Sequence, residues 1–549
     1  MLPTVIRRMA IVCVMLSAVT APDLSKATTG ASVIEQARAC TAIAEADFSN
    51  IPDAPTRVNE AKIIDTPEEL LEGLAHVAPE ALVVQARKGL PQIQPYCRIS
   101  GYVSPNVGFE LLLPADHWNG KFLHVGCFGW CGTTGFVGIQ CSKHPEYACI
   151  GTDMGHTGSG GLWFRNNLQA QVDFSYRATH VATLAGKAIT ERFYAGKPNR
   201  SYFLGCSTGG YQGMVEAQRF PSDFDGVVAG APDMDESDLA LRGVWIKRNF
   251  VGREGKPLFS PADIQLIHSA ALARCDIDDG VRDGIVSDPV HCPFDPAQLR
   301  CKVGKTSQCL TGAQVQAVQN IYGAPMSSKG MQLSSRGVFP GSEANWPEMF
   351  ANTWGDEYFK DTGLLSSPGK EWTYMDFDFD HDHDYARAGV GVLFVDTNPD
   401  LRKFKASGGK LISYQGGNDG FEIPGAVVDY YETVERTMGS RAATQEFFRL
   451  FIIPGMNHCF EGDGVFVFDY LSYLETWVET GRAPDVMIGA HPKDLPKFGI
   501  FALRPPLDPS TPVSFTRPVY PYPLYARYKG SGDPSDAKSF VPVLPKVVH

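Results

Sequence analysis

The sequence predicts an α/β fold, in which a mainly parallel β-sheet carries a large inserted segment. Short apolar runs typical of buried strands alternate with segments of helical pattern. One strand-to-helix junction, at residues 201–218, contains a Gly-x-Ser-x-Gly sequence. More than 200 residues separate this junction from a strand-and-turn signal at 410–420, which indicates an insertion in the sheet.

The junction centres on Ser207. Residues 201–204 are typical of a short buried strand, and residues 210–218 of the helix that follows. A Gly-x-Ser-x-Gly sequence places its serine on a tight turn, where the flanking Gly205 and Gly209 leave the hydroxyl exposed to substrate. Because a pentapeptide match alone also fits an ordinary glycine turn, Ser207 requires partners elsewhere in the chain.

His458 and Asp419 are the candidate partners. A nucleophilic serine requires a general base and a carboxylate that orients the base. Asp419 follows a strand-like segment at 410–414, and His458 follows the next one, at 449–453. The chain order Ser, Asp, His is that of α/β-hydrolases, whose catalytic groups collect at the carboxyl ends of the strands. We therefore predict an α/β-hydrolase catalytic domain with Ser207, Asp419 and His458 as its catalytic residues.

Structural roles compete with these assignments. Most of the 13 histidines are expected to be structural or exposed, and Asp419 lies in an Asn-Asp-Gly sequence that is also common in turns. Asp223 and Asp225 follow Ser207 too closely to match the chain order, so we interpret them as structural. His156, which follows a strand-like segment at 147–150, is a reserve candidate.

An acyl-transfer site also requires backbone amides that stabilise an oxyanion. In this fold one amide belongs to the residue after the nucleophile, here Thr208, and another to an early strand-to-helix loop. The loop 126–132, Gly-Cys-Phe-Gly-Trp-Cys-Gly, follows the strand-like segment 121–125. Gly126 and Cys127 are its candidate donors.

The first 27 residues are typical of a signal peptide. Arg7 and Arg8 precede an apolar run at 9–18 that is too short to cross a bilayer. We therefore expect a secreted or periplasmic protein. A net charge of −12 and the lack of a basic stripe argue against nucleic acid and membrane as partners, and the sequence does not determine the oligomeric state.

An exported chain with an even number of cysteines is expected to form disulfides. Of the 13 cysteines, Cys13 would leave with the signal peptide. Their clustering suggests four pairs, Cys40–Cys97, Cys275–Cys292, Cys301–Cys309 and Cys206–Cys459. The unassigned cysteines are Cys127, Cys131, Cys141 and Cys149. A bond between Cys206 and Cys459 would fix the Ser207 loop against the His458 loop.

The inserted segment should form a lid over the site. The strand-like segment 224–230 ends at a Pro-containing turn, and sheet-like character resumes near 391–394. We therefore expect a lid at 233–388 and a catalytic domain made of 28–232 and 389–549.

Two acidic stretches lie in this segment. The first, at 275–288, offers an oxygen-rich set that suits calcium, although its spacing is not that of an EF-hand and a plain acidic turn is the alternative. The candidate ligands are the carboxylates of Asp276, Asp279 and Asp283 and the backbone carbonyls of Val281 and Ile285. The second stretch, at 376–384, we interpret as an exposed lid edge.

Together these residues resemble the tannase and feruloyl esterase family of α/β-hydrolases over most of the chain. The matching features are the Cys-Ser and His-Cys pairs with Asp419, the segments 205–210, 219–226 and 522–533, and the calcium loop. The resemblance implies hydrolysis of esters of aromatic carboxylic acids through an acyl-enzyme, with structural calcium and no organic cofactor. Feruloyl or chlorogenate-like esters are the favoured small substrates; galloyl esters and terephthalate half-esters are alternatives.

Two features depart from the family pattern. Relatives usually carry a C-terminal cysteine pair, whereas this chain has Tyr520 at one of those positions and no cysteine after Cys459. The loop 126–132 holds Phe128 and Trp130 where relatives are glycine-rich. A non-enzymatic alternative is a calcium-stabilised protein that binds polyphenols or glycans, against which the complete Ser, Asp and His set argues.

Overall fold

The computed structural model describes residues 30–251, 255–350, 354–364, 368–369, 371–496 and 498–546. The expected signal peptide lies outside these residues. Within them, a nine-stranded mixed sheet organises the molecule, in the order β1-β2-β3-β5-β4-β6-β7-β8-β9. Its strands are β1 (Thr56–Ile64), β2 (Tyr96–Val103), β3 (Val107–Pro114), β4 (Lys121–Val125), β5 (Ala148–Thr152), β6 (Arg200–Cys206), β7 (Gly226–Gly230), β8 (Lys410–Gly416) and β9 (Phe448–Ile453).

The sheet is antiparallel at one edge and parallel elsewhere. β1, β2, β3 and β5 pair antiparallel, whereas β5, β4, β6, β7, β8 and β9 pair parallel. Every residue of β7 is buried, as expected of a strand covered on both faces. The carboxyl ends of the parallel strands therefore meet at one edge of the sheet.

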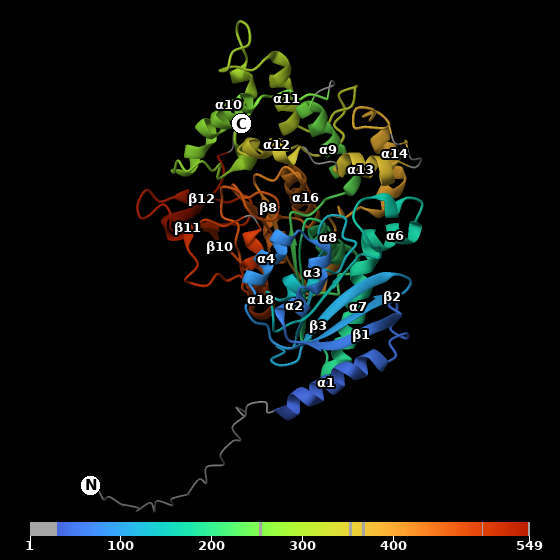
Figure 1. Cartoon of the computed structure of the whole chain (residues 1–549). Helices are drawn as coiled ribbons and strands as arrows, with labels where there is room; N and C mark the ends of the chain where they lie inside the picture. Colours follow the sequence, from blue (N-terminus) through green and yellow to red (C-terminus); the bar gives the residue numbers. More distant parts are fainter. Residues whose placement is uncertain are drawn as a thin grey trace, which may run out of the picture.

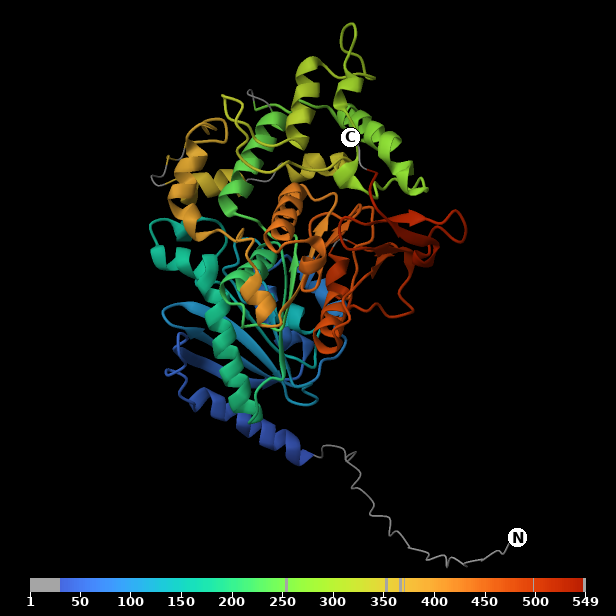
Figure 2. The same ribbon diagram turned by 180° about the vertical axis from the view of Figure 1, so that it is seen from behind.

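Helices cover both faces of the sheet. α7 (Ala178–Tyr194), α8 (Thr208–Arg219) and α16 (Pro424–Thr437) share one apolar core with the strands, and Figure 2 shows α7 running along that face. α5 (Val137–Cys141) and α18 (Tyr470–Thr480) share a second core with the opposite face. Successive residues of β8 divide between the two cores, because side chains alternate along a strand. Shorter or peripheral helices are α1 (Gly30–Glu45), α2 (Pro67–Leu70), α3 (Glu72–Val77), α4 (Glu80–Lys88), α6 (Leu168–Val172), α15 (Arg402–Ala406) and α17 (Arg441–Gln445).

A helical insertion separates β7 from β8 and lies above the sheet in Figure 1. Its helices are α9 (Glu236–Val251), α10 (Pro261–Cys275), α11 (Gly312–Tyr322), α12 (Trp346–Met349), α13 (Trp354–Tyr358) and α14 (Asp382–Ala388). Apolar side chains of these helices, including Ile246, Ile267 and Val318, form a separate core. The expected limits of a lid domain, 233–388, remain a prediction.

The expectation that sheet structure resumes near 391–394 is wrong. Val390–Leu393 forms a 3₁₀ turn, and β8 is the next strand beside β7. Because the apolar run is only four residues long, periodicity cannot separate a strand from a helical turn. Val392 is 64% exposed, whereas Phe394 at the end of the run is buried in the core.

Two small antiparallel sheets complete the chain. β10 (Met487–Pro492) pairs with β11 (Val513–Val519), and β12 (Tyr525–Tyr528) pairs with β13 (Phe540–Val543). β12 contacts the turn Asp276–Asp279, which lies within the acidic loop of the insertion. The part of the chain that the structure describes has no helix long and apolar enough to cross a membrane.

Candidate active site

Ser207 lies on the turn between β6 and α8. Its φ of 64° and ψ of −130° are rare for a residue with a side chain, and such strain is common at functional sites. A Cβ atom on Gly205 would lie 2.4 Å from the carbonyl oxygen of Gly209, so only glycine fits there. The Ser207 amide donates to the carbonyl of Gly230 at 3.0 Å. These contacts fix the serine at the carboxyl edge of the sheet.

Asp419 and His458 form a hydrogen-bonded pair at the same edge. The Oδ2 atom of Asp419 lies 2.9 Å from Nδ1 of His458. Asp419 is fully buried, and its Oδ1 accepts hydrogen bonds from the amides of Phe421 and Glu422 at 2.8 and 3.1 Å. Gln415 donates to Oδ2 at 2.9 Å. The carboxylate therefore has one fixed orientation and engages Nδ1 of His458, so Nε2 is the ring nitrogen not bound to Asp419.

Ser207 contacts Glu422 instead of His458. Its Oγ lies 3.5 Å from Oε1 of Glu422, and the described residues include no Ser207–His458 hydrogen bond. Glu422 is 3% exposed. Burial, with the nearby charges of Asp233 and Asp419, raises the pKa of Glu422 well above that of an ordinary carboxyl. A buried carboxyl group with a raised pKa therefore lies against the candidate nucleophile.

Sequence reasoning missed Glu422. The one available signal was its position three residues after Asp419 in the same loop. That signal is weak, because the burial of Glu422 depends on segments far away in the chain. Asp233, just after β7, and Arg242, on α9, both influence its pKa and are themselves almost completely buried.

The Cys206–Cys459 disulfide joins the serine loop to the histidine loop. It connects cysteines 253 residues apart, with a Cα–Cα distance of 6.0 Å. The other three pairs suggested by the sequence are also present. The unassigned cysteines form Cys127–Cys131 and Cys141–Cys149.

The loop that follows β4 lies against the serine turn, but the expected oxyanion donors are engaged. A Cβ atom on Gly126 would lie 2.5 Å from Cα of Gly209. The Gly126 amide donates to the Leu204 carbonyl at 2.9 Å, and the Cys127 amide donates to Gln212 Oε1 at 2.9 Å. The expectation that these two amides face the site is therefore wrong, because one extends the strand ladder and the other binds α8.

The amides of Thr208 and Phe128 fit the oxyanion role better. Thr208 is the first residue of α8, so its amide has no partner within the helix. Across the described chain, neither this amide nor that of Phe128 forms a hydrogen bond. The Thr208 hydroxyl donates to the Gly129 carbonyl at 2.7 Å and holds the loop beside the helix.

Other candidates have structural roles. His156 stacks on Trp163 with ring centroids 3.4 Å apart, and burial lowers its pKa to about 4. Asp225 accepts a hydrogen bond from the Ser201 amide at 2.8 Å. In the second acidic stretch, Asp376 and Asp384 are exposed, as expected for a lid edge.

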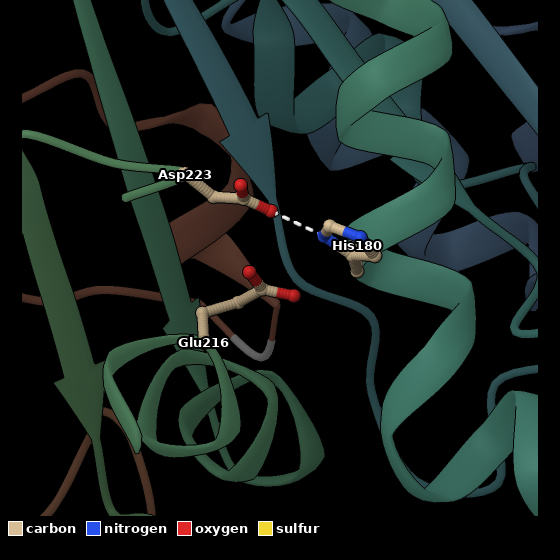
Figure 3. Close-up of side chains that lie close together, drawn as sticks. All are labelled: His180, Glu216 and Asp223. Carbon is tan, nitrogen blue, oxygen red and sulfur yellow. Dashed lines mark hydrogen bonds and ion pairs between the residues drawn. The ribbon is translucent and has the colours of Figure 1, made fainter. Parts of the chain in front are cut away.

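Asp223 belongs to a buried cluster with His180 of α7 and Glu216 of α8. Asp223 Oδ2 lies 2.6 Å from His180 Nδ1, and Figure 3 shows Glu216 pointing towards both. Their potential metal-ligand atoms lie within 4.8 Å of one another, the only such set of three among the described residues. Burial and Asp223 raise the Glu216 pKa strongly, whereas Lys187 lowers it and donates to the Asp223 carbonyl. The raised Glu216 pKa and the neighbouring Lys187 therefore both limit the negative charge that a metal ion would neutralise.

The acidic loop of the insertion folds around its carboxylates. Asp276 accepts a hydrogen bond from the Asp283 amide at 3.3 Å, and Asp279 accepts one from the Val281 amide at 2.8 Å. Burial raises the pKa of Asp279 to about 6, and the charge of Asp283 contributes. Asp283 also pairs with Arg517 of β11. Several partly buried carboxylates in one loop fit a hard cation, although Arg517 already supplies part of the positive charge.

Comparisons with known proteins agree with this geometry. The profile of the family described as "Tannase and feruloyl esterase" matches residues 92–372 and 377–543. Mono(2-hydroxyethyl) terephthalate hydrolase of Piscinibacter sakaiensis is 33% identical over 529 residues, which cover 82% of this chain and 85% of that protein. A probable feruloyl esterase of Arthroderma benhamiae is 33% identical over 465 residues, covering 80% and 83% of the two chains.

Solved structures show the same fold. Feruloyl esterase B from Aspergillus oryzae superposes with a TM-score of 0.78 at 28% identity, covering 92% of this chain and all of that one. Tannin acyl hydrolase from Aspergillus niger has a TM-score of 0.71 over 93% and 96% of the two chains, and at 20% identity it supports the fold alone. The chain therefore belongs to the tannase and feruloyl esterase family of α/β-hydrolases and is a carboxylic ester hydrolase.

Proposed function

We propose that the protein is an exported serine esterase that hydrolyses feruloyl or chlorogenate-like esters through an acyl-enzyme. The hydrogen bond between Asp419 and His458, tied by the Cys206–Cys459 disulfide to the strained Ser207 turn, carries the proposal. Such a set provides a nucleophile, a base and a group that orients the base.

In the proposed mechanism, Ser207 rotates from Glu422 towards His458 when substrate binds and attacks the ester carbonyl. His458 takes the hydroxyl proton through Nε2 and then donates it to the departing alcohol. The amides of Thr208 and Phe128 stabilise the tetrahedral oxyanion. Water then attacks the acyl-enzyme by the same route, and Asp419 keeps the imidazole oriented throughout.

The choice of a phenolic acyl group is supported by several relatives at 30% identity or more whose names give feruloyl esterase activity. Galloyl esters remain an alternative within the family. A terephthalate half-ester is a second candidate, because one relative at 33% identity bears that activity in its name. It ranks lower because its free carboxylate needs a cation, and Arg242, the buried arginine near the site, is surrounded by the acidic residues Asp233 and Glu422.

Calcium in the acidic loop and export from the cytoplasm belong to the same proposal. Asp276, Asp279 and Asp283, with the carbonyls of Val281 and Ile285, would hold the ion, whose role would be structural. Six disulfides support an oxidising compartment, periplasmic or extracellular.

The test compares wild type with Ser207→Ala on methyl ferulate, chlorogenate, methyl gallate and mono(2-hydroxyethyl) terephthalate. We expect turnover of a phenolic ester that disappears in the variant, and a fluorophosphonate adduct on Ser207 in wild type alone. Activity that survives in a folded Ser207→Ala protein would exclude this serine as nucleophile. A folded wild type with neither turnover nor an adduct would instead support a binding protein.

A further inference from the structure

A cavity of about 180 Å³ adjoins the Cys206–Cys459 disulfide. Gly205, Cys206 and Cys459 form part of its wall, but Ser207 and His458 do not line it. Apolar cavities of about 150 Å³ accept benzene, so this volume is sufficient for a substituted single ring. The cavity is therefore separate from the reacting atoms, although it contacts both loops that carry them.

Aromatic side chains dominate the wall. The rings of Tyr414 and Tyr470 stack with centroids 4.0 Å apart and an interplanar angle of 3°. Phe460 and Phe501 meet edge to face at 6.2 Å. Flat faces and ring edges of this kind favour an aromatic ligand over an aliphatic one.

Lys143 adds a cation to this mainly apolar lining. Lys143 retains intermediate exposure where it lines the cavity, and within the described chain it forms no ion pair. Burial and the nearby Arg504 lower the Lys143 pKa to about 8, which is the effect of a cation without a counter-ion. A cation without a counter-ion favours an anionic ligand.

The other titratable groups in the wall do not neutralise Lys143. Asp469 is the acidic residue of the wall, and its two oxygens accept hydrogen bonds from the amide and hydroxyl of Ser472, at 3.2 and 2.6 Å. Burial lowers the pKa of His144 to about 4, so this side chain is neutral near pH 7. The wall therefore contains one lysine and one aspartate, and Lys143 forms no ion pair within the described chain.

We propose that this cavity is a binding site for an aromatic carboxylate, whose ring lies among the aromatic side chains and whose carboxylate pairs with Lys143. The inference is drawn from the residues that line the cavity. It rests on the proposed function only because aromatic acids are also products of the proposed reaction. Since the walls include both disulfide cysteines, the occupied site would brace the loops of Ser207 and His458.

The test is calorimetric titration of ferulate into enzyme whose Ser207 has been blocked with a fluorophosphonate. We expect one ferulate per blocked chain, with affinity about tenfold weaker in Lys143→Met, because a charge-assisted hydrogen bond is lost. Lys143→Arg keeps the charge and should stay within about threefold of wild type. Methyl ferulate, which lacks the carboxylate, should bind no better to wild type than to Lys143→Met.

Three outcomes overturn the proposal. The first is that blocked wild type fails to bind ferulate, and the second is that blocked Lys143→Met binds it as tightly as blocked wild type. The third outcome is that Lys143→Met, without the block, raises KM for ester substrates by the same factor by which it weakens ferulate binding. The last outcome would place the cavity within the substrate site. Thermal unfolding of each variant establishes that it is folded. If fluorophosphonate does not label Ser207, the proposed function fails, and the titration is made with Ser207→Ala and Ser207→Ala/Lys143→Met.

Discussion

At the scale of single residues, the buried carboxyl of Glu422 is expected to influence how Ser207 responds to pH, because the two side chains are in contact. Burial and neighbouring carboxyls raise the Glu422 pKa well above that of an ordinary carboxyl, so Glu422 ionises at a higher pH than an exposed glutamate does. An ionised Glu422 would accept the Ser207 hydroxyl proton in a strong hydrogen bond. It would also place negative charge beside the oxyanion.

We therefore predict that wild-type activity falls on the alkaline side and that Glu422→Gln removes this fall. The glutamine keeps the shape and stays neutral, so kcat/KM for methyl ferulate near pH 6 should remain within about threefold of wild type. The measurement is kcat/KM between pH 5 and 10 for both proteins. Identical alkaline limbs would show that Glu422 does not control the profile.

Asp419→Asn tests the orientation of the base. Asp419 accepts hydrogen bonds from two backbone amides and contacts His458. Asparagine would preserve the size of the side chain but lose the charge that stabilises the imidazolium. In other serine hydrolases this change lowers kcat by about 10⁴, and we expect a loss of similar order here. Steady-state kinetics with methyl ferulate measures this loss, and near-wild-type kcat would contradict the role of Asp419.

Single residues also differ in how far their surroundings can be predicted from sequence. Ser207 could be located because the glycines that allow its turn are adjacent in the chain. Glu422 could not, because its burial depends on Asp233 and Arg242 from other segments. Gly126 and Cys127 lie in the expected loop, but their amides bind Leu204 and Gln212, which are contacts set by the register of β4 and by α8.

At the scale of elements, the order of strands and loops is more predictable than their limits. The strands that lead to Ser207, Asp419 and His458 have clear apolar patterns bounded by turns. Residues 391–394 have an equally apolar composition, yet they form a 3₁₀ turn because nothing in four residues distinguishes the two structures. The pairing of Cys127, Cys131, Cys141 and Cys149 required the folded chain.

The disulfide between the serine and histidine loops should affect both stability and activity. It closes a loop between cysteines 253 residues apart. For a loop of this length, the loss of chain entropy in the unfolded state stabilises the fold by at most about 5 kcal/mol. We expect Cys206→Ala/Cys459→Ala to lower the free energy of unfolding by about 2–5 kcal/mol and to reduce kcat, because the two loops then move independently.

The matched control is Cys301→Ala/Cys309→Ala. This disulfide lies in the insertion and joins cysteines only eight residues apart. Its entropic contribution to the free energy of unfolding is therefore roughly 2.5 kcal/mol. It should leave kcat unchanged. Chemical denaturation and kinetics on both variants provide the comparison, and equal kcat values in both would show that the Cys206–Cys459 bond has no part in positioning the loops.

At the scale of the whole molecule, the acidic loop connects the insertion to the C-terminal strands. Asp283 pairs with Arg517 of β11, and β12 contacts the Asp276–Asp279 turn. A calcium ion here would therefore stabilise two regions that are more than 200 residues apart in sequence. Because a ligand that binds only the folded state stabilises by mass action, the effect should increase with calcium concentration.

We predict that removal of calcium with EGTA lowers Tm by several degrees. Calcium at 100 times its Kd adds about 2.7 kcal/mol to the free energy of unfolding, and EGTA removes this contribution. Asp279→Asn should abolish the response to added calcium, because Asp279 is the most buried carboxylate of the loop. Asp384→Asn, in the exposed acidic stretch, is the control and should respond like wild type. Differential scanning calorimetry with and without calcium measures the shifts. Equal Tm values for wild type in EGTA and in calcium would exclude a structural ion and leave the Arg517–Asp283 pair as the link between the insertion and the C-terminal strands.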